Sequence, residues 1–234
     1  MRRQGLTAYD VAGHYDEAYF ADLSARYRRR NRFARQRIEN VFSLLPAALE
    51  GRHLLDVGCG MGTFAVEAAR RGAIAVGLDP APAAVAAARR VAAAEQAPAA
   101  FIRGDAAALP LAGASMDVML AADVTEHLDD ETLRRVLREA ARVLRPGGTL
   151  VLYTPEQSHL FERLRERGVL DPDPSHIGVR SAAELVSAAR AAGLRVERTT
   201  WLPSHVPGWN LLERGLGRWV PLLRRRIGLV ALRP

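Results

Sequence analysis

The residues best suited to chemistry gather in two short stretches of the sequence. The first, "LLDVGCGMGTF" at residues 54–64, places Gly58, Gly60 and Gly62 directly behind an apolar run and an aspartate. Alternating glycines allow positive φ angles and let a ligand approach the backbone closely. Their order fits neither the G-x-G-x-x-G dinucleotide pattern nor the lysine-containing phosphate loop. Asp56 beside the turn would repel a pyrophosphate and would suit a ligand that carries an ammonium group.

The second stretch, "ADVTEHLDD" at residues 122–130, combines carboxylates with a histidine. If it begins a helical turn, Asp123 and His127 share a face at i and i+4, and Glu126 lies beside them. Histidine is suited to proton transfer near neutral pH because its ordinary pKa is about 6.5. His127 and Glu126 are therefore candidates for acid–base chemistry.

Alternating strands and helices must position both stretches. Strands are predicted at 53–58, 73–79, 99–105, 116–123, 149–155, 195–201 and 226–233, and helices at 63–72, 82–95, 131–148 and 181–193. Such alternation predicts an α/β fold, a three-layer sandwich in which helices cover both faces of a mostly parallel sheet. The last two strands leave little room for a regular helix between them. We therefore expect a seven-stranded sheet with an antiparallel edge strand.

The composition is typical of one soluble globular domain. The 234 residues are 49% hydrophobic and 25% charged, and no apolar run is long enough to cross a membrane. The N-terminus lacks a secretory h-region, and the single Cys59 excludes an internal disulfide, which favours a cytoplasmic location. Residues 1–50 are predicted to form an N-terminal helical lid over a ligand-binding domain at 51–234.

All 33 basic residues are arginine, and the net charge is +7. A solvated arginine surface explains this charge as well as a nucleic-acid partner does.

Four motifs in register resemble those of the class I S-adenosylmethionine-dependent methyltransferases. "LLDVGCGMGTF" is similar to their motif I, and "VGLDPAP", "GDAAALPLAGASMDVMLAADVTEHL" and "VLRPGGTLVLYTP" are similar to the motifs that follow it. The resemblance covers roughly residues 50–200. It implies a Rossmann-like fold, S-adenosyl-L-methionine as cofactor and methyl transfer as the reaction.

The resemblance also implies roles for particular residues. Asp79 would bind the ribose hydroxyls, while Asp105 and the backbone of Ala106 would contact the adenine edge. The full set of implied cofactor-binding residues is Asp56, Gly58, Cys59, Gly60, Gly62, Asp79, Pro80, Asp105, Ala106 and Ala122.

On the substrate side, the ubiquinone-biosynthesis O-methyltransferases and the small-RNA terminal 2′-O-methyltransferases carry a similar acid-x-x-Glu-His segment. A further histidine follows strand five in those enzymes, and His176 is the candidate here, with His159 as a second option. The implied catalytic residues are His127, Glu126 and His176. With Asp123 they would form a mixed site for a divalent metal, which is the weaker hypothesis because the first position is aspartate and the flanking aromatic residues are absent. A capping or packing role for these residues is the remaining alternative.

The predicted function is methyl transfer to a small organic acceptor, first at a hydroxyl oxygen and next at nitrogen or carbon. The alternatives are an RNA 2′-O-methyltransferase, a methyltransferase of a lipid or quinone-like substrate, and an inactive cofactor-binding module. Tyr15 and Tyr19 could close over the ligands, or pack on the sheet. The tryptophan-containing segment 202–226 suits a pocket wall, edge packing or contact with a membrane surface. The partner expected is the small-molecule acceptor rather than nucleic acid, in a monomer or homodimer.

Overall fold

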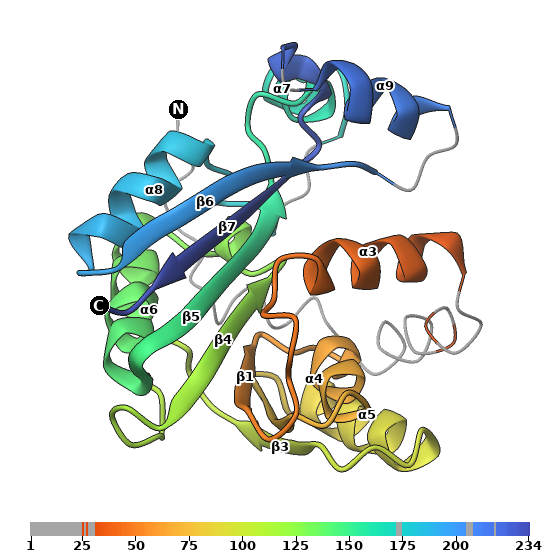
Figure 1. The fold of residues 1–234 in the computed structure, drawn as a ribbon. Helices are drawn as coiled ribbons and strands as arrows, with labels where there is room; N and C mark the ends of the chain where they lie inside the picture. Colours follow the sequence, from red (N-terminus) through yellow and green to blue (C-terminus); the bar gives the residue numbers. More distant parts are fainter. Residues whose placement is uncertain (1–24, 26, 28–30, 172–174, 205–207, 218) are drawn as a thin grey trace.

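Seven strands form one mixed sheet in this computed structural model, which describes residues 25, 27, 31–171, 175–204, 208–217 and 219–234 (Figure 1). The strands are β1 (His53–Val57), β2 (Ile74–Asp79), β3 (Ala100–Arg103), β4 (Met116–Ala122), β5 (Leu144–Pro155), β6 (Arg195–Leu202) and β7 (Arg226–Leu232). Their order is β3-β2-β1-β4-β5-β7-β6. β1 to β5 run parallel, whereas β7 runs antiparallel to β5 and β6. The predicted sheet is confirmed, with the antiparallel strand β7 placed beside the edge strand β6.

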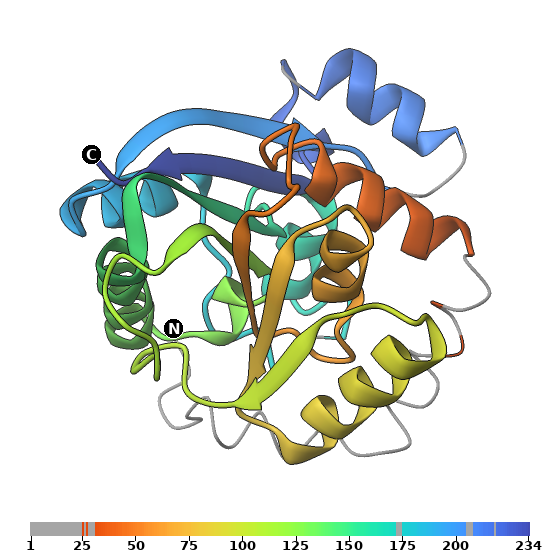
Figure 2. The same ribbon diagram turned by 60° about the horizontal axis from the view of Figure 1, so that its bottom comes forward.

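Helices cover both faces of the sheet, as the alternation predicts (Figure 2). On one face lie α3 (Arg32–Phe42), α4 (Thr63–Ala69) and α5 (Pro82–Ala94); on the other lie α6 (Asp130–Val143) and α8 (Ala182–Ala191). Neighbouring side chains of a strand point to opposite faces, so Leu54 belongs to the first core and Leu55 to the second. The near-continuous apolar run of β1 therefore follows from burial on both sides.

Helix ends follow local signals in the sequence. Asp129 caps α6 by accepting a hydrogen bond from the backbone N–H of Thr132 at 2.7 Å. Ser181 and Glu184 form a reciprocal capping box at the start of α8. These caps fix where each helix begins and hence how the chain enters the loops at the strand ends.

Three segments differ in detail from the expected elements. α6 ends at Val143 and β5 begins at Leu144, so the Pro-Gly-Gly segment belongs to the strand. The irregular segment 156–180 contains α7 (Leu160–Glu166). The segment 202–226 contains α9 (Trp209–Leu216) and the 3₁₀ helix η2 (Pro221–Leu223). Its glycines at 208 and 217 flank α9 and limit its length.

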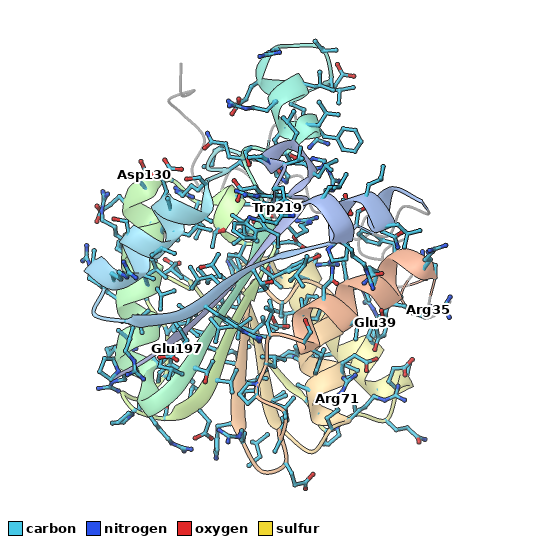
Figure 3. The ribbon with its side chains drawn as sticks, turned by 45° about the horizontal axis from the view of Figure 1, so that its top comes forward. Arg35, Glu39, Arg71, Asp130, Glu197 and Trp219 are labelled. Carbon is cyan, nitrogen blue, oxygen red and sulfur yellow. The ribbon has the colours of Figure 1, made fainter. Side chains whose placement is uncertain are left out.

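Most of the predicted N-terminal lid, including Tyr15 and Tyr19, lies outside the described residues. Its last helix, α3, packs on the sheet through the buried Ile38 and Val41. Asn40 donates hydrogen bonds to the Tyr153 hydroxyl at 3.3 Å and to the Pro203 carbonyl at 2.9 Å. On the outer face of the same helix, Arg35 and Glu39 point to solvent (Figure 3). α3 therefore ties the sheet edge to the strand-end loops.

Candidate active site

The glycine turn follows β1 at the carboxyl edge of the sheet, and all three of its glycines have positive φ. A Cβ on Gly58, at φ +62°, would lie 2.5 Å from Cγ2 of Val124. A Cβ on Gly62, at φ +81°, would lie 2.7 Å from the Phe101 ring. At these two positions glycine is therefore required by the protein's own packing as well as by any ligand. The contact with Val124 also brings the turn directly against the loop that follows β4.

Two buried carboxylates lie beside this turn. Asp56 accepts a hydrogen bond from the backbone N–H of Ala65 at 3.2 Å, and burial raises its pKa to about 7, with a smaller contribution from the charge of Asp79. Asp79 accepts hydrogen bonds from the backbone N–H groups of Gly60 and Ala81, both at 2.9 Å. Burial also raises the pKa of Asp79. Asp79 thus fixes the glycine turn to the end of β2.

The other predicted cofactor-binding residues occupy the same edge of the sheet. Asp105 follows β3 and accepts a hydrogen bond from the backbone N–H of Ala107 at 2.8 Å. Pro80 and Ala106 are half-buried, and Ala122 is buried at the end of β4. Cys59 lies within the core, where burial raises the pKa of its thiol. A buried thiol with a raised pKa is a packing group rather than a nucleophile.

Glu126 and His127 of the second stretch lie next to His176, the later histidine that the resemblance implies. Candidate ligand atoms of Glu126, His127 and His176 all lie within 4.8 Å of one another. The His127 and His176 rings pack edge to face with centroids 5.1 Å apart. Nδ1 of His127 lies 2.9 Å from the Ser175 carbonyl oxygen, which can only accept a hydrogen bond. That contact favours the tautomer with its proton on Nδ1 and a lone pair on Nε2.

Glu126 is the most deeply buried member of this cluster, at 1% exposure. It accepts a hydrogen bond from the Thr154 hydroxyl at 2.9 Å. Burial and the charge of Asp123 raise its pKa to about 7, although His127 and Arg226 oppose the shift. A carboxyl group with such a pKa changes its protonation state near neutral pH.

Asp123 lies next to the cluster but takes part in different contacts. Its φ of +57° places it before the 3₁₀ turn η1 (Thr125–His127) rather than on one helical face with His127. Its two oxygens accept hydrogen bonds from Arg37 and Arg226, each at 2.5 Å. Burial alone would raise its pKa, but the charges of Arg226 and Arg37 outweigh burial and lower it. Asp123 is therefore an ionised anchor for two arginines.

His159, the second option for the later histidine, is fully buried away from this cluster. Its Nδ1 accepts a hydrogen bond from the backbone N–H of Phe161 at 3.2 Å and caps α7. Burial, reinforced by nearby arginines, lowers its pKa to about 4. His159 is thus a neutral capping residue of α7.

Comparison with known proteins decides the family. Residues 54–148 match the methyltransferase domain family. A probable S-adenosylmethionine-dependent methyltransferase of Mycolicibacterium smegmatis is 37% identical over 168 residues, which are 70% of this chain and 60% of that protein. The ubiquinone biosynthesis O-methyltransferase of Methylobacterium nodulans is 35% identical over 66% of this chain and 64% of its own length. This chain carries a class I S-adenosylmethionine-dependent methyltransferase domain.

The fold of this methyltransferase domain also matches solved structures. The geranyl diphosphate C-methyltransferase of Streptomyces coelicolor, solved with Mg²⁺, geranyl diphosphate and S-adenosyl-L-homocysteine, superposes with a TM-score of 0.65. It is 20% identical, and the match covers 84% of this chain and 78% of that one. At this identity the likeness concerns the fold alone. The chain covers 60% of the length of the Mycolicibacterium smegmatis relative and 64% of the length of the Methylobacterium nodulans relative.

Sequence reasoning about the methyltransferase domain missed the residues that surround the acidic cluster. Arg37 comes from α3, Arg226 from the start of β7, and Thr154 from the end of β5. Tyr153 accepts a hydrogen bond at its backbone carbonyl from the N–H of Asp123 at 2.7 Å. No local pattern marks these residues, because it is the sheet order that places β5 beside β4 and β7 beside β5.

The segment 202–226 contributes both a buried and an exposed part. Ser204 and Arg225 line a cavity, whereas Leu211 on α9 is 70% exposed. Trp219, which follows α9 (Figure 3), is 69% exposed. Among the described helices, none has the length and apolar character needed to span a bilayer. Contact of α9 with a membrane surface stays a prediction.

Proposed function

We propose that this protein transfers the methyl group of S-adenosylmethionine to a hydroxyl oxygen of a small organic acceptor. The observation that carries the proposal is the contact between the two chemical stretches. Val124 packs on Gly58 of the proposed cofactor turn, and Glu126 and His127 lie two and three residues after it. Proton-accepting groups therefore lie beside the place where a sulfonium cofactor would present its methyl group.

The proposed cofactor contacts use the carboxyl edge of the sheet. Asp56 would face the ammonium group of the cofactor, and Asp79 would accept from the ribose hydroxyls while still holding the turn. Asp105 and Ala106 would contact the adenine. S-adenosylmethionine supplies an activated methyl group with a neutral thioether as leaving group, so the protein mainly has to align the reactants and accept a proton.

His127 is the proposed general base. The contact between its Nδ1 and the Ser175 carbonyl orients the ring with Nε2 as the proton acceptor. Glu126 is close enough for its charge to stabilise the imidazolium that forms, and His176 packs against the same ring.

A divalent cation is the second candidate use of the same residues. One carboxylate and two imidazoles within 4.8 Å form a suitable mixed donor set, and Asp123 lies outside it in its ion pairs with arginines. Such an ion would hold and acidify the acceptor hydroxyl when bound.

The test is transfer of labelled methyl from S-adenosylmethionine to a panel of catechols, phenolic lipids and short RNAs, with cofactor binding measured separately. We expect turnover with a small hydroxyl acceptor. Binding without transfer to any acceptor would identify an inactive module. Turnover confined to RNA, with affinity falling steeply as salt increases, would establish the nucleic-acid alternative.

Removal of metal separates the two roles of the cluster. With His127 as general base, activity should survive exhaustive EDTA treatment, because proton transfer needs no ion. If activity were lost with EDTA and restored by Mg²⁺ or Mn²⁺, the cluster would be a metal site and His127 would not be the general base. A melting curve before and after treatment controls for unfolding.

Cofactor binding should depend on pH through Asp56. The pKa of about 7 leaves Asp56 largely protonated in mildly acidic buffer, and the ammonium group of the ligand favours its ionised form. Binding then releases a proton, so affinity rises with pH. Between about pH 5.5 and 7 the association constant for S-adenosylhomocysteine should increase roughly tenfold.

Calorimetry in buffers of different ionisation enthalpy measures this proton release. The Asp56→Asn variant should bind with little pH dependence, whereas Glu126→Gln should keep the wild-type slope. A slope that persists in Asp56→Asn would assign the proton to another group, with Asp79 as the next candidate.

A further inference from the structure

A cavity opens beside the acidic cluster, between α3, the end of β5 and the two segments that flank α9. It holds about 310 Å³, including the part open to solvent. Its wall contains three arginines, Arg37, Arg225 and Arg226, together with the hydrogen-bonding side chains of Gln36 and Ser204. None of the residues that line it is acidic. The cavity wall therefore carries positive charge alongside apolar groups such as the Phe33 ring.

Two of these arginines share a single carboxylate. Arg37 and Arg226 each contact one oxygen of Asp123, which balances one of their two positive charges. Arg226 also lies 3.9 Å from Glu126. Neither Asp123 nor Glu126 lines the cavity itself, so the charged groups on its wall are the three guanidinium groups.

Arg225 has no carboxylate partner at all among the described residues. Its guanidinium lies over the Phe161 ring at 5.1 Å, and Nη1 is 3.5 Å from Nδ1 of His159, a residue kept neutral by its low pKa. The nearby carboxylates are engaged elsewhere: Glu162 pairs with Arg165 at 2.6 Å, and Glu213 accepts from the backbone of Ser204. Burial and the charge of Arg226 lower the pKa of Arg225. Arg225 lines the cavity, and the charges of Glu162 and Glu213 reach it, but neither carboxylate forms an ion pair with it. Its guanidinium can therefore donate hydrogen bonds to an anionic ligand.

We infer that this cavity binds an anionic group of the methyl acceptor, a carboxylate or a phosphate, with Arg225 as its principal hydrogen-bond donor. The inference rests on the proposed methyl transfer and names the class of its substrate. Arg226 connects the cavity to Asp123 and Glu126, so an acceptor held by its anionic end would direct its remaining atoms toward that cluster. Gln36 and Ser204 are further polar residues on the cavity wall.

The cofactor also carries a carboxylate, so the arginine that would bind the acceptor must be distinguished from one that would bind the cofactor. The contacts of Arg37 and Arg225 make this distinction. Arg37 lies over the Phe64 ring of α4 at 5.1 Å, and its charge acts on Asp56. It therefore stands on the cofactor side of the cavity. Arg225 instead contacts Phe161 and His159 of the α7 segment. Its charge is available to a second ligand.

Matched small ligands test this assignment. Benzoate, phenyl phosphate and neutral benzamide are titrated by calorimetry into the full chain saturated with S-adenosylhomocysteine. At least one acid should bind about tenfold more tightly than benzamide, and that preference should disappear in Arg225→Gln and persist in Arg225→Lys. The better of the two acids distinguishes a carboxylate site from a phosphate site. Arg224→Gln is the matched control, because Arg224 stacks on Trp201 at 4.2 Å and does not line the cavity.

Three results would overturn the inference: equal binding of benzamide and both acids, undetectable binding of either acid, or an unchanged preference in Arg225→Gln. Weaker binding of S-adenosylhomocysteine to Arg225→Gln would assign the arginine to the cofactor and would overturn it as well. Melting temperatures of all variants establish that they are folded. Selective anion binding without methyl transfer to any acceptor would leave the anion site intact and contradict the proposed function alone.

Discussion

Replacing His127 with glutamine should slow methyl transfer by about 10²- to 10⁴-fold, the usual contribution of a positioned general base. Glutamine preserves a hydrogen-bonding side chain next to the Ser175 carbonyl but cannot accept a proton at neutral pH. The loss should fall on kcat, because the proposed cofactor contacts lie on the glycine turn and on the ends of β2 and β3. Single-turnover transfer of labelled methyl, with S-adenosylhomocysteine affinity measured in parallel, gives both quantities.

His53→Gln is the matched control, since His53 starts β1 at the opposite edge of the sheet. It should transfer methyl at the wild-type rate. Glu126→Gln adds a second readout, because it removes the carboxylate that would stabilise the imidazolium formed on His127, so kcat should fall while cofactor affinity is kept. Wild-type kcat in a folded His127→Gln variant would exclude His127 as the base and leave alignment of the reactants as the whole mechanism.

The fold could be predicted from the sequence because its determinants are local. Apolar runs of strand length, separated by amphipathic segments with caps such as Asp129 and Ser181, fix each element and its ends. The sequence predicts only one of the two reasons for the glycines in the turn after β1. Gly58 and Gly62 were assigned to ligand approach, yet both are also required by side chains from β3 and the β4 loop. Such contacts depend on the order of the strands in the sheet, which cannot be predicted from any single segment of the sequence.

The contacts of Asp123 show most clearly which features of the site cannot be predicted from the sequence. Its partners Arg37 and Arg226 are 86 and 103 residues away. Spacing alone places Asp123 on one helical face with His127, but its positive φ turns it out of the 3₁₀ helix. In a chain with 33 arginines and no lysine, nothing in the sequence distinguishes Arg225 from Arg224 and Arg226 beside it. Only the packing shows which guanidinium lacks a carboxylate.

The second large effect concerns Asp79. The Asp79→Ala variant should bind S-adenosylhomocysteine more weakly by about 1.5–3 kcal/mol, or roughly 10- to 100-fold, since charge-assisted hydrogen bonds to the ribose would be lost. The same change removes the acceptor for the N–H groups of Gly60 and Ala81, so the glycine turn also loses its attachment to β2. Isothermal titration of the folded variant measures the loss.

Asp117→Ala separates these two contributions. Asp117 likewise holds a backbone N–H, that of His53 at 2.8 Å, and pairs with Arg145 at 2.6 Å, but it lies at the opposite edge of the sheet. Its removal should lower the melting temperature without changing cofactor affinity. Asp79→Asn keeps one oxygen for the turn and loses the charge, so a large loss of affinity in this variant would come from the ligand contact itself. Wild-type affinity in both Asp79 variants would mean that the ribose is held by other groups and that Asp79 serves only to fix the turn.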